Sequence, residues 1–229
     1  TKAPKDCPAL PVSVTVIVSG IGKSGRPKGA YTTAMMAKDA KALVDHLKIR
    51  DFHLVGVSMG GMISQEYALA YQSDLRSLTL CCTYAAPGPF CSRMFKLWQD
   101  MAPVMGVPAV MRDVTLWAFT QEFFLMREGT LREFEAAMAG LDQPVEAYLA
   151  QLNSIQTHDT RARLKTIEVP TLVLAGADDI LIPNSGSVPF AGPGFSAVSA
   201  TPEATTNGES GTAVMMTFVV LLPGTESPK

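Results

Sequence analysis

One serine in the sequence is framed by glycines in a way that could serve nucleophilic chemistry. Ser58 lies in the stretch Gly56-Val57-Ser58-Met59-Gly60. Glycines two positions on either side of the serine remove side chains that would collide in a sharp turn from a strand into a helix. Such a turn exposes the hydroxyl and directs the N–H of Met59 toward the place where an oxyanion would form. Ser58 is therefore a candidate nucleophile and the Met59 N–H a candidate oxyanion donor; the alternative is a tight turn that only needs small residues.

A nucleophilic serine needs a general base, and the base needs an acid that orients it. Two adjacent aspartates, Asp178 and Asp179, lie in the stretch "LVLAGADDILIP" at residues 172–183, where an apolar run ends in a loop. One of them is readily explained as an acidic turn residue. The other is a candidate for the orienting acid.

The sequence contains three histidines, and all of them precede Asp179. His46 lies in a predicted helix, and His53 begins the run before Ser58, at the end away from the serine. His158 falls in the connector "HDTR". Each is best explained as a surface or packing residue. His158 is kept as the candidate base, because side-chain placement and not sequence order decides which residues form a triad.

Short apolar runs alternate with longer helical patterns along the chain. Strands are predicted at residues 12–18, 52–57, 75–82 and 169–176, and helices at residues 34–47 and 60–71. Thr33 is the predicted N-cap of the first helix. This alternation indicates an α/β fold with a parallel sheet covered on both faces. Ser58 and Asp179 would then both follow the carboxyl ends of strands, with their side chains about 6 to 8 Å apart, the length of one imidazole and two hydrogen bonds.

The segment between residues 82 and 169 has a different character, because methionine and aromatic residues are frequent and the pattern is mostly helical. Residues 145–155 form one clear amphipathic helix. These side chains favour a helical bundle packed against itself, with methionine as a gap-filler. A second interpretation, compatible with the first, is a helical cap whose apolar underside roofs a pocket. Composition alone favours the bundle.

The C-terminal stretch differs again. Residues 184–229 contain no histidine and only four charged side chains, and Gly, Ser, Thr, Ala and Pro dominate. We expect residues 184–211 to be largely coil and to pack poorly, with one strand possible within residues 213–222.

Length and charge narrow the class of protein. A chain of 229 residues, of which 47% are hydrophobic, suits one domain or one domain with an insertion. The net charge of −2 gives no reason to expect nucleic acid or an anionic membrane as a partner. The apolar runs at residues 12–18 and 213–222 are too short for a signal-peptide core or a membrane span. The four cysteines are too few and too irregular for a disulfide framework or a zinc site, and they fit a cytoplasmic protein.

Four stretches resemble motifs of the α/β-hydrolase superfamily, in the group of small esterases, enol-lactonases and cofactor-free haloperoxidase-like enzymes. They are "GIGKSGRP" at residues 20–27, "GVSMGGM" at 56–62, "LRSLTL" at 75–80 and "HDTRARLKTIEVPTLVLAGADDILIP" at 158–183. The resemblance covers residues 20–183 and implies the α/β-hydrolase fold with a helical cap. In that family the acid lies four positions before the proline of its loop, and this spacing selects Asp179.

The resemblance also implies a function. It is the hydrolysis of a carboxylic ester or lactone with an apolar substrate, through an acyl-enzyme on Ser58. Asp179 would orient the base, and the Met59 N–H would hold the oxyanion. No metal and no organic cofactor are implied. The corresponding division is a hydrolase core at residues 1–84 and 161–229, with a cap inserted at residues 85–160.

Both ends of the chain depart from the family pattern. The family has a histidine after the last strand and an H-G motif that supplies a second oxyanion donor, whereas residues 184–229 and 1–19 contain neither. We therefore expect a fold truncated at the front and irregular at the C-terminus. A divergent or spliced product would explain this, and so would a shifted reading frame. The chain would hydrolyse esters barely above background; the alternative is a non-catalytic binding or regulatory protein that retains the hydrolase fold.

Overall fold

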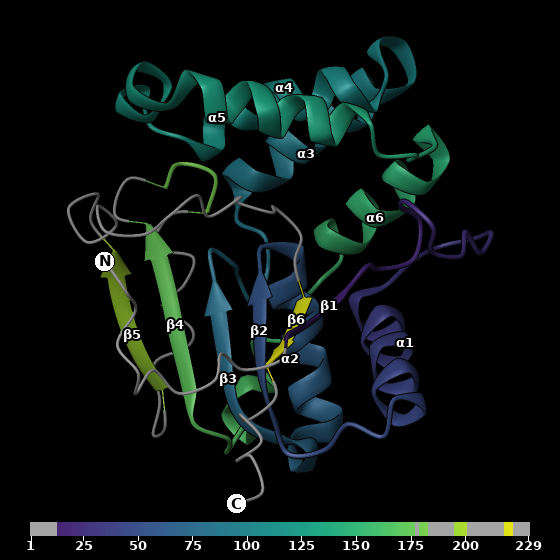
Figure 1. Cartoon of the computed structure of the whole chain (residues 1–229), viewed down its shortest axis with the longest axis vertical. Helices are drawn as coiled ribbons and strands as arrows, with labels where there is room; N and C mark the ends of the chain where they lie inside the picture. The colour runs from purple at the N-terminus through teal and green to yellow at the C-terminus, as the bar shows by residue number, and fades with distance from the viewer. Residues whose placement is uncertain (1–12, 177–178, 183–194, 201–217, 222–229) are drawn as a thin grey trace, which may run out of the picture.

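The structure is a computed structural model, and it describes residues 13–176, 179–182, 195–200 and 218–221. Within these ranges the chain forms a six-stranded sheet in the order β1-β6-β2-β3-β4-β5 (Figure 1). The strands are β1 (Ser13–Val16), β2 (Phe52–Val57), β3 (Leu75–Cys81), β4 (Thr171–Gly176), β5 (Phe195–Ala200) and β6 (Phe218–Leu221). Strand β2, which leads directly into Ser58, lies in the interior of the sheet.

The direction of the strands follows the prediction in the part of the sheet that carries the candidate site. Strands β2, β3, β4 and β5 are parallel to their neighbours. Strand β6 is antiparallel to both β1 and β2, between which it lies. The sequence predicts a strand within residues 213–222 but not this antiparallel insertion, because strand direction depends on the connection between strands and not on local residue pattern.

Strand β5 corrects the expectation of coil across residues 184–211. Its residues pair with β4, from Phe195 opposite Thr171 to Ala200 opposite Gly176. The stretch "FSAVSA" contains few β-branched residues, so its local preference for a strand is weak. The hydrogen bonds offered by a neighbouring strand decide its conformation. The rest of residues 184–211, like residues 1–12, lies outside the described residues.

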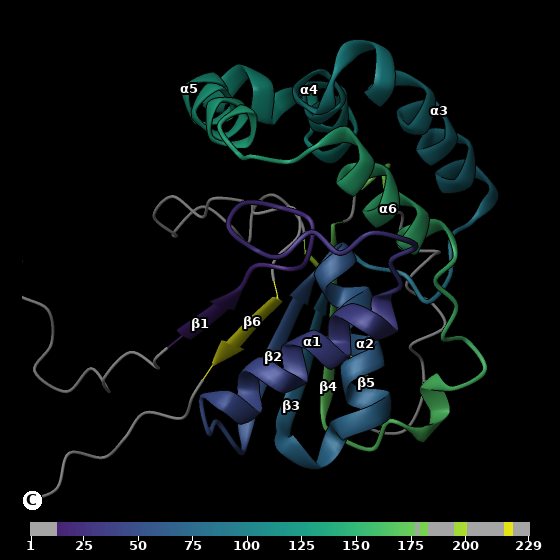
Figure 2. The same cartoon turned by 90° about the vertical axis from the view of Figure 1, so that its right-hand side faces the viewer.

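One face of the central strands is fully buried against two helices. Phe52 and Leu54 on β2 have no exposed surface. Helices α1 (Thr33–His46) and α2 (Met59–Tyr71) pack side by side on this face (Figure 2). The ring of Tyr67 on α2 meets Phe52 edge-on, with 6.0 Å between ring centroids. Burial of each large side chain contributes about 1.5 to 3 kcal/mol, so β2 and α2 are held firmly on either side of the turn that joins them.

Helix α1 shows that the predicted N-cap is wrong by one residue. The cap is Thr32, whose side chain accepts a hydrogen bond from the Met35 N–H at 3.0 Å. Thr33 is instead the first helical residue. Both threonines suit a cap by type, and the one with extended backbone geometry takes the role. The hydroxyl of Thr33 is thereby left to bond elsewhere.

Four helices follow one another between β3 and β4. They are α3 (Pro89–Met105), α4 (Val107–Ala118), α5 (Gln121–Ala139) and α6 (Val145–Gln156). They lie over the carboxyl ends of the parallel strands (Figure 1). The helical character predicted for this segment is confirmed, whereas the domain boundaries at residues 85 and 160 stay a prediction. Among the helices of the described residues, none has the length and apolarity that a membrane crossing requires.

Candidate active site

Ser58 occupies the turn between β2 and α2 in a strained backbone conformation. Its φ is 53° and its ψ is −121°, a region that residues with a side chain rarely adopt. The Ser58 N–H donates to the Cys81 carbonyl at 2.9 Å. The Ser58 carbonyl accepts hydrogen bonds from the Gly61 N–H and the Thr83 hydroxyl, each at 2.9 Å. The neighbouring strand and the first turn of the helix therefore hold the serine in the geometry that the sequence predicts.

Two glycines of this turn are required by space. A Cβ atom on Gly56 would lie 2.5 Å from the Gly60 carbonyl oxygen. A Cβ atom on Gly61 would lie 2.6 Å from the Cβ of Thr83. Real Cβ contacts are never this short, so the strand, the helix and the loop after β3 approach too closely for any side chain at these positions. The predicted steric cause is thus confirmed for Gly56, and Gly61, one position beyond the predicted Gly60, is subject to the same limit.

Met59 places a backbone N–H at the start of α2, beside the serine. As the first residue of α2, it has an N–H group without an acceptor inside the helix. The helix dipole adds a partial positive charge at this end. The Met59 side chain is fully buried, which fixes the backbone around it. The arrangement suits the predicted role of this N–H as an oxyanion donor.

Ser58 opens into an apolar pocket under the helices that follow β3. Four helices, the loop after β3 and the loop after β4 contribute to its wall, and aromatic or aliphatic side chains make up most of it. The lining residues are Ser58, Met62, Tyr84, Phe95, Trp98, Met111, Val114, Tyr148, Gln151, Leu152, Ile155, Leu181 and Ile182. The apolar side chains of α3, α4 and α6 therefore both pack against one another and roof a pocket, so that the two interpretations of this segment hold together.

Asp179 lies in the loop after β4, at the same edge of the sheet as Ser58. Its carboxylate accepts a hydrogen bond from the Ile182 N–H at 2.8 Å. Burial raises the pKa of Asp179, and hydrogen bonds from the Ile182 N–H and the Cys82 thiol oppose that rise. Because β3 lies between β2 and β4, the two strand ends are about 10 Å apart. Asp178 lies outside the described residues, and the predicted 6 to 8 Å between the side chains of Ser58 and Asp179 stays a prediction.

Cys82 lies between the two candidate residues, and sequence reasoning missed its position. It directly follows β3, with a left-handed φ of 45°, and it is partly exposed rather than a core residue. Burial and the nearby charge of Asp179 raise the pKa of the Cys82 thiol to about 11. The thiol is therefore protonated at neutral pH and can donate its hydrogen to the carboxylate. Cys82 follows β3, which lies between the strands that lead to Ser58 and Asp179. This position at the end of a strand is the signal that could have indicated the contact.

Two of the three histidines lie away from the serine. His46 is exposed in the last turn of α1. His53 stands near the start of β2, at the opposite end of the strand from Ser58, and its Nδ1 is 2.7 Å from the hydroxyl of Ser77. Both agree with their interpretation as surface or packing residues.

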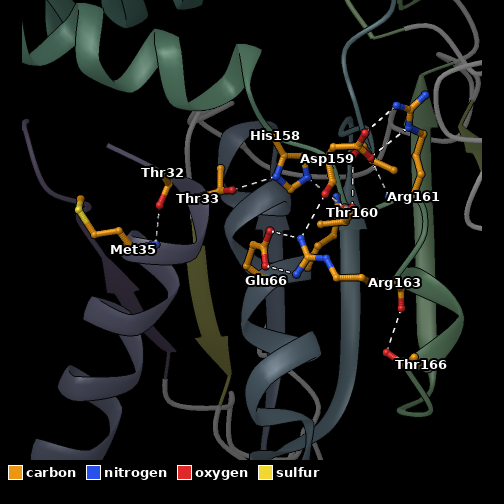
Figure 3. A network of polar contacts seen from close by, with 12 residues as sticks. Thr32, Thr33, Met35, Glu66, His158, Asp159, Thr160, Arg161, Arg163 and Thr166 are labelled. Atoms are coloured by element: carbon orange, nitrogen blue, oxygen red, sulfur yellow. Dashed lines mark hydrogen bonds and ion pairs between the residues drawn. The ribbon is translucent and has the colours of Figure 1, made fainter. Parts of the chain in front are cut away.

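His158 is buried in a network of polar contacts that joins three segments (Figure 3). Its Nδ1 is 2.9 Å from the Thr33 hydroxyl, and its Nε2 is 3.3 Å from the Gln65 Oε1. The Gln65 Nε2 donates to the Tyr84 carbonyl at 3.0 Å, so the Gln65 Oε1 must act as acceptor. The proton of a neutral His158 then lies on Nε2, and Nδ1 accepts from Thr33. Thr160 also donates to the Gln65 Oε1, at 2.5 Å.

The environment of His158 keeps it neutral. Burial lowers the pKa of His158 to about 4, and the nearby charge of Glu66 opposes this shift. Glu66 is itself paired with Arg163, whose nitrogens lie 2.8 and 2.6 Å from its two oxygens (Figure 3). Both ring nitrogens of His158 are thus engaged by partners other than Ser58. Among the described residues, none of the three histidines forms a hydrogen bond with Ser58 or Asp179.

The sequence is similar to those of known hydrolases. The sequence model of the alpha/beta hydrolase fold matches residues 13–196, a span wider at both ends than residues 20–183. A putative carbamate hydrolase, RutD, from Azorhizobium caulinodans is 31% identical over 166 residues. The aligned part covers 72% of this chain and 63% of that protein, so the chain spans less than two thirds of the relative's length.

Two solved structures have a similar fold. A hydrolase from Pseudomonas aeruginosa PA01 is 27% identical with a TM-score of 0.69, over 80% of this chain and 68% of that chain. The enol-lactonase from Burkholderia xenovorans LB400 is 25% identical with a TM-score of 0.71, over 80% of this chain and 69% of that chain.

Proposed function

We propose that this chain, which belongs to the alpha/beta hydrolase family, hydrolyses a small carboxylic ester or lactone at Ser58. One observation carries the proposal. Ser58 stands in a left-handed turn, between a strand and the N-terminus of a helix, and faces an apolar pocket. A strained backbone at a site held by its surroundings is common where geometry serves chemistry.

In the proposed reaction the Ser58 Oγ attacks the carbonyl carbon of the substrate. The carbonyl oxygen becomes an oxyanion, which the Met59 N–H at the start of α2 stabilises. The tetrahedral intermediate collapses to an acyl-enzyme and releases the alcohol, or opens the lactone ring. Water then attacks the ester carbonyl and regenerates the Ser58 hydroxyl. Each attack needs a base that removes a proton, and Asp179 would orient such a base.

The choice of an ester or lactone rests on the pocket and on the relatives. Aromatic and aliphatic side chains line most of the wall, which suits an uncharged organic group next to the scissile bond. One similar solved structure is an enol-lactonase, and the curated relative is named a putative carbamate hydrolase. Hydrolysis of an ester, a lactone or a carbamate in each case cleaves a bond between a carbonyl carbon and a heteroatom. The apolar wall favours an ester or lactone over a carbamate, whose polar nitrogen would lose its hydrogen bonds with water there.

Two further parts of the proposal concern organisation and location. Residues 85–160 would form a cap on a core of residues 1–84 and 161–229, since α3 to α6 all lie between β3 and β4 and roof the pocket. The three cysteines of the described residues are free thiols, which suits a reducing compartment such as the cytoplasm.

We propose that this chain performs the reaction slowly. The three histidines of the sequence lie in the described residues, and their hydrogen bonds and positions leave Ser58 without an imidazole base. Without a base the serine hydroxyl stays protonated at neutral pH and is a weak nucleophile. The same observation favours a second candidate function, a binding or regulatory protein that holds a small ligand in the pocket without turning it over.

Covalent labelling with a fluorophosphonate separates the two candidates. We expect the label on Ser58, at a rate far below that of a serine with a complete triad. The labelled residue would be identified by peptide mass spectrometry, with Ser58→Ala as the matched control. Label that is absent from Ser58 after prolonged incubation would favour the binding protein.

A further inference from the structure

One carboxylate fixes the position of both tryptophans in the chain. The Trp98 indole N–H on α3 donates to the Asp113 Oδ2 at 2.7 Å, and the Trp117 indole N–H donates to the same oxygen at 3.2 Å. Asp113 and Trp117 both lie on α4. The carboxylate thereby ties α3 to α4 at the level of the Trp98 ring.

Trp98 belongs to the pocket wall, whereas Trp117 does not line the pocket. The Trp98 side chain is only 4% exposed, and its ring packs against Phe95 with 5.5 Å between centroids. Hydrogen bonding on one edge and ring packing on another leave the indole little freedom. The wall formed by Trp98 is therefore a fixed boundary of the space beside Ser58.

The pocket is small. The volume that the centre of a water molecule can reach within it is about 40 Å³. A position for one water needs roughly 10 to 15 Å³ on this measure, so about three to four water-sized positions are available. This corresponds to a group of about three to five non-hydrogen atoms.

The wall also offers little to a polar ligand. None of the described residues that line the pocket carries a charge. The Gln151 amide is already used on both sides, since it donates to the Ser19 carbonyl at 2.7 Å and accepts from Gln143 at 2.7 Å. The Tyr84 hydroxyl donates to the Ile155 carbonyl at 3.2 Å. Away from the Ser58 hydroxyl and the Met59 N–H, a charged ligand group would lose its hydration and find mostly apolar side chains, with the Tyr148 hydroxyl as the remaining polar group of the wall.

From these contacts we propose that Trp98 sets the length of the group accepted beside Ser58, and that Asp113 is the positioning residue that holds Trp98. The group is neutral and apolar, with about three to five non-hydrogen atoms. Under the proposed function, on which this assignment to the substrate rests, it is a short acyl chain. Asp113 acts through the indole and does not touch the substrate.

The test uses straight-chain primary alcohols, from ethanol to octanol, with binding to the whole chain measured by isothermal titration calorimetry. Alcohol binding needs no reaction at Ser58. We expect the affinity to rise about fourfold per added methylene while the chain enters the pocket. The rise should stop near butanol, because further methylenes find no room.

The variants test the two residues separately. Trp98→Ala and the milder Trp98→Phe should move the stopping point to longer alcohols. Asp113→Ala should do the same, and Asp113→Asn should restore the short limit, because its amide oxygen can still accept from the indoles. Trp117→Phe is the matched control, since it removes the other indole from the same carboxylate and should leave the limit unchanged.

A merely structural role for Asp113 would lower stability without moving the chain-length limit. The proposal is overturned if no alcohol binds the wild-type chain, or if affinity in the wild type keeps rising through octanol. It is also overturned if the limit stays in place in both Trp98→Phe and Asp113→Ala. A chain-length limit that appears while Ser58 resists labelling would support this inference and contradict the proposed hydrolysis instead.

Discussion

Ser58 holds a backbone conformation that costs a residue with a side chain on the order of 1 to 3 kcal/mol. Hydrogen bonds from Gly61 and Thr83 to its carbonyl, and its own N–H bond to Cys81, keep it there. We predict that Ser58→Gly raises the free energy of unfolding by about 1 kcal/mol relative to Ser58→Ala, since glycine tolerates the left-handed region. Urea denaturation of both variants measures this difference. Equal stabilities would mean that the turn stores no strain at this position.

Because of His158, we predict that the free energy of unfolding falls as the pH is lowered into the acid range. Burial lowers the pKa of His158 from 6.5 to about 4 in the folded protein. The unfolded chain therefore takes up a proton below about pH 6.5 that the folded chain takes up only near pH 4. The contribution to stability is full above the unfolded pKa and is lost as the pH falls through the folded one. The shift corresponds to about 3 kcal/mol.

Urea denaturation from neutral pH to about pH 4 measures this loss of stability. His158→Gln cannot titrate, so we expect its free energy of unfolding to depend less on pH over this range by about 3 kcal/mol. The same change at His46, which is exposed in the last turn of α1, supplies the matched control for the loss of one histidine. An unchanged slope in His158→Gln would show that the ring takes up its proton at the same pH in the folded and the unfolded chain.

At the scale of elements, the approach of α2 to the loop after β3 is limited by Gly61. We predict that Gly61→Ala lowers the free energy of unfolding by about 1 to 3 kcal/mol, because the new Cβ would overlap Thr83. Gly129→Ala in α5 is the matched control, because a Cβ there meets nothing within 4 Å. That change should raise stability by about 0.5 to 1 kcal/mol. Thermal or urea unfolding measures both changes. Equal shifts in the two variants would contradict the steric role of Gly61.

The sequence predicts elements well where their pattern is local. Strand β2 has the predicted bounds, and α2 begins one residue before its predicted start, because apolar alternation and glycine spacing are visible in the residues themselves. Strand β5 was not predicted, since "FSAVSA" acquires its structure by pairing with β4. The N-cap of α1 was misplaced because two adjacent threonines are equivalent by type, and only backbone geometry separates them.

In the candidate site too, the features that depend on local sequence were predicted, and those that depend on distant segments were not. The elbow at Ser58, its glycines and the donor at Met59 follow from one short motif, and the resemblance to a known family selected Asp179. The contact between Asp179 and Cys82 was missed, because it depends on the order of strands that are distant in sequence and end at one edge of the sheet. The partners of His158 were also hidden, since Thr33 and Gln65 lie 125 and 93 residues away from it.

At the scale of the whole molecule, the fold brings together an elbow serine, the N-terminus of a helix, an apolar pocket and a buried aspartate. None of the histidines forms a hydrogen bond with Ser58 or Asp179 within the described residues; Cys82, at the end of the strand between theirs, lies near the Asp179 carboxylate and influences its pKa. The elbow serine and the buried aspartate are the basis of the proposed acyl transfer, and none of the three histidines forms a hydrogen bond with Ser58 within the described residues. Loss of one triad member costs a serine hydrolase several orders of magnitude in rate.

The most direct test of this account is the hydrolysis rate of a short p-nitrophenyl ester, such as the butyrate, by the wild-type chain and by Ser58→Ala. We predict that the wild-type rate barely exceeds the uncatalysed background and that Ser58→Ala changes it little, since an unactivated hydroxyl is a poor nucleophile. A robust wild-type rate that Ser58→Ala abolishes would contradict the account, because it would require a base that the positions of His46, His53 and His158 do not supply.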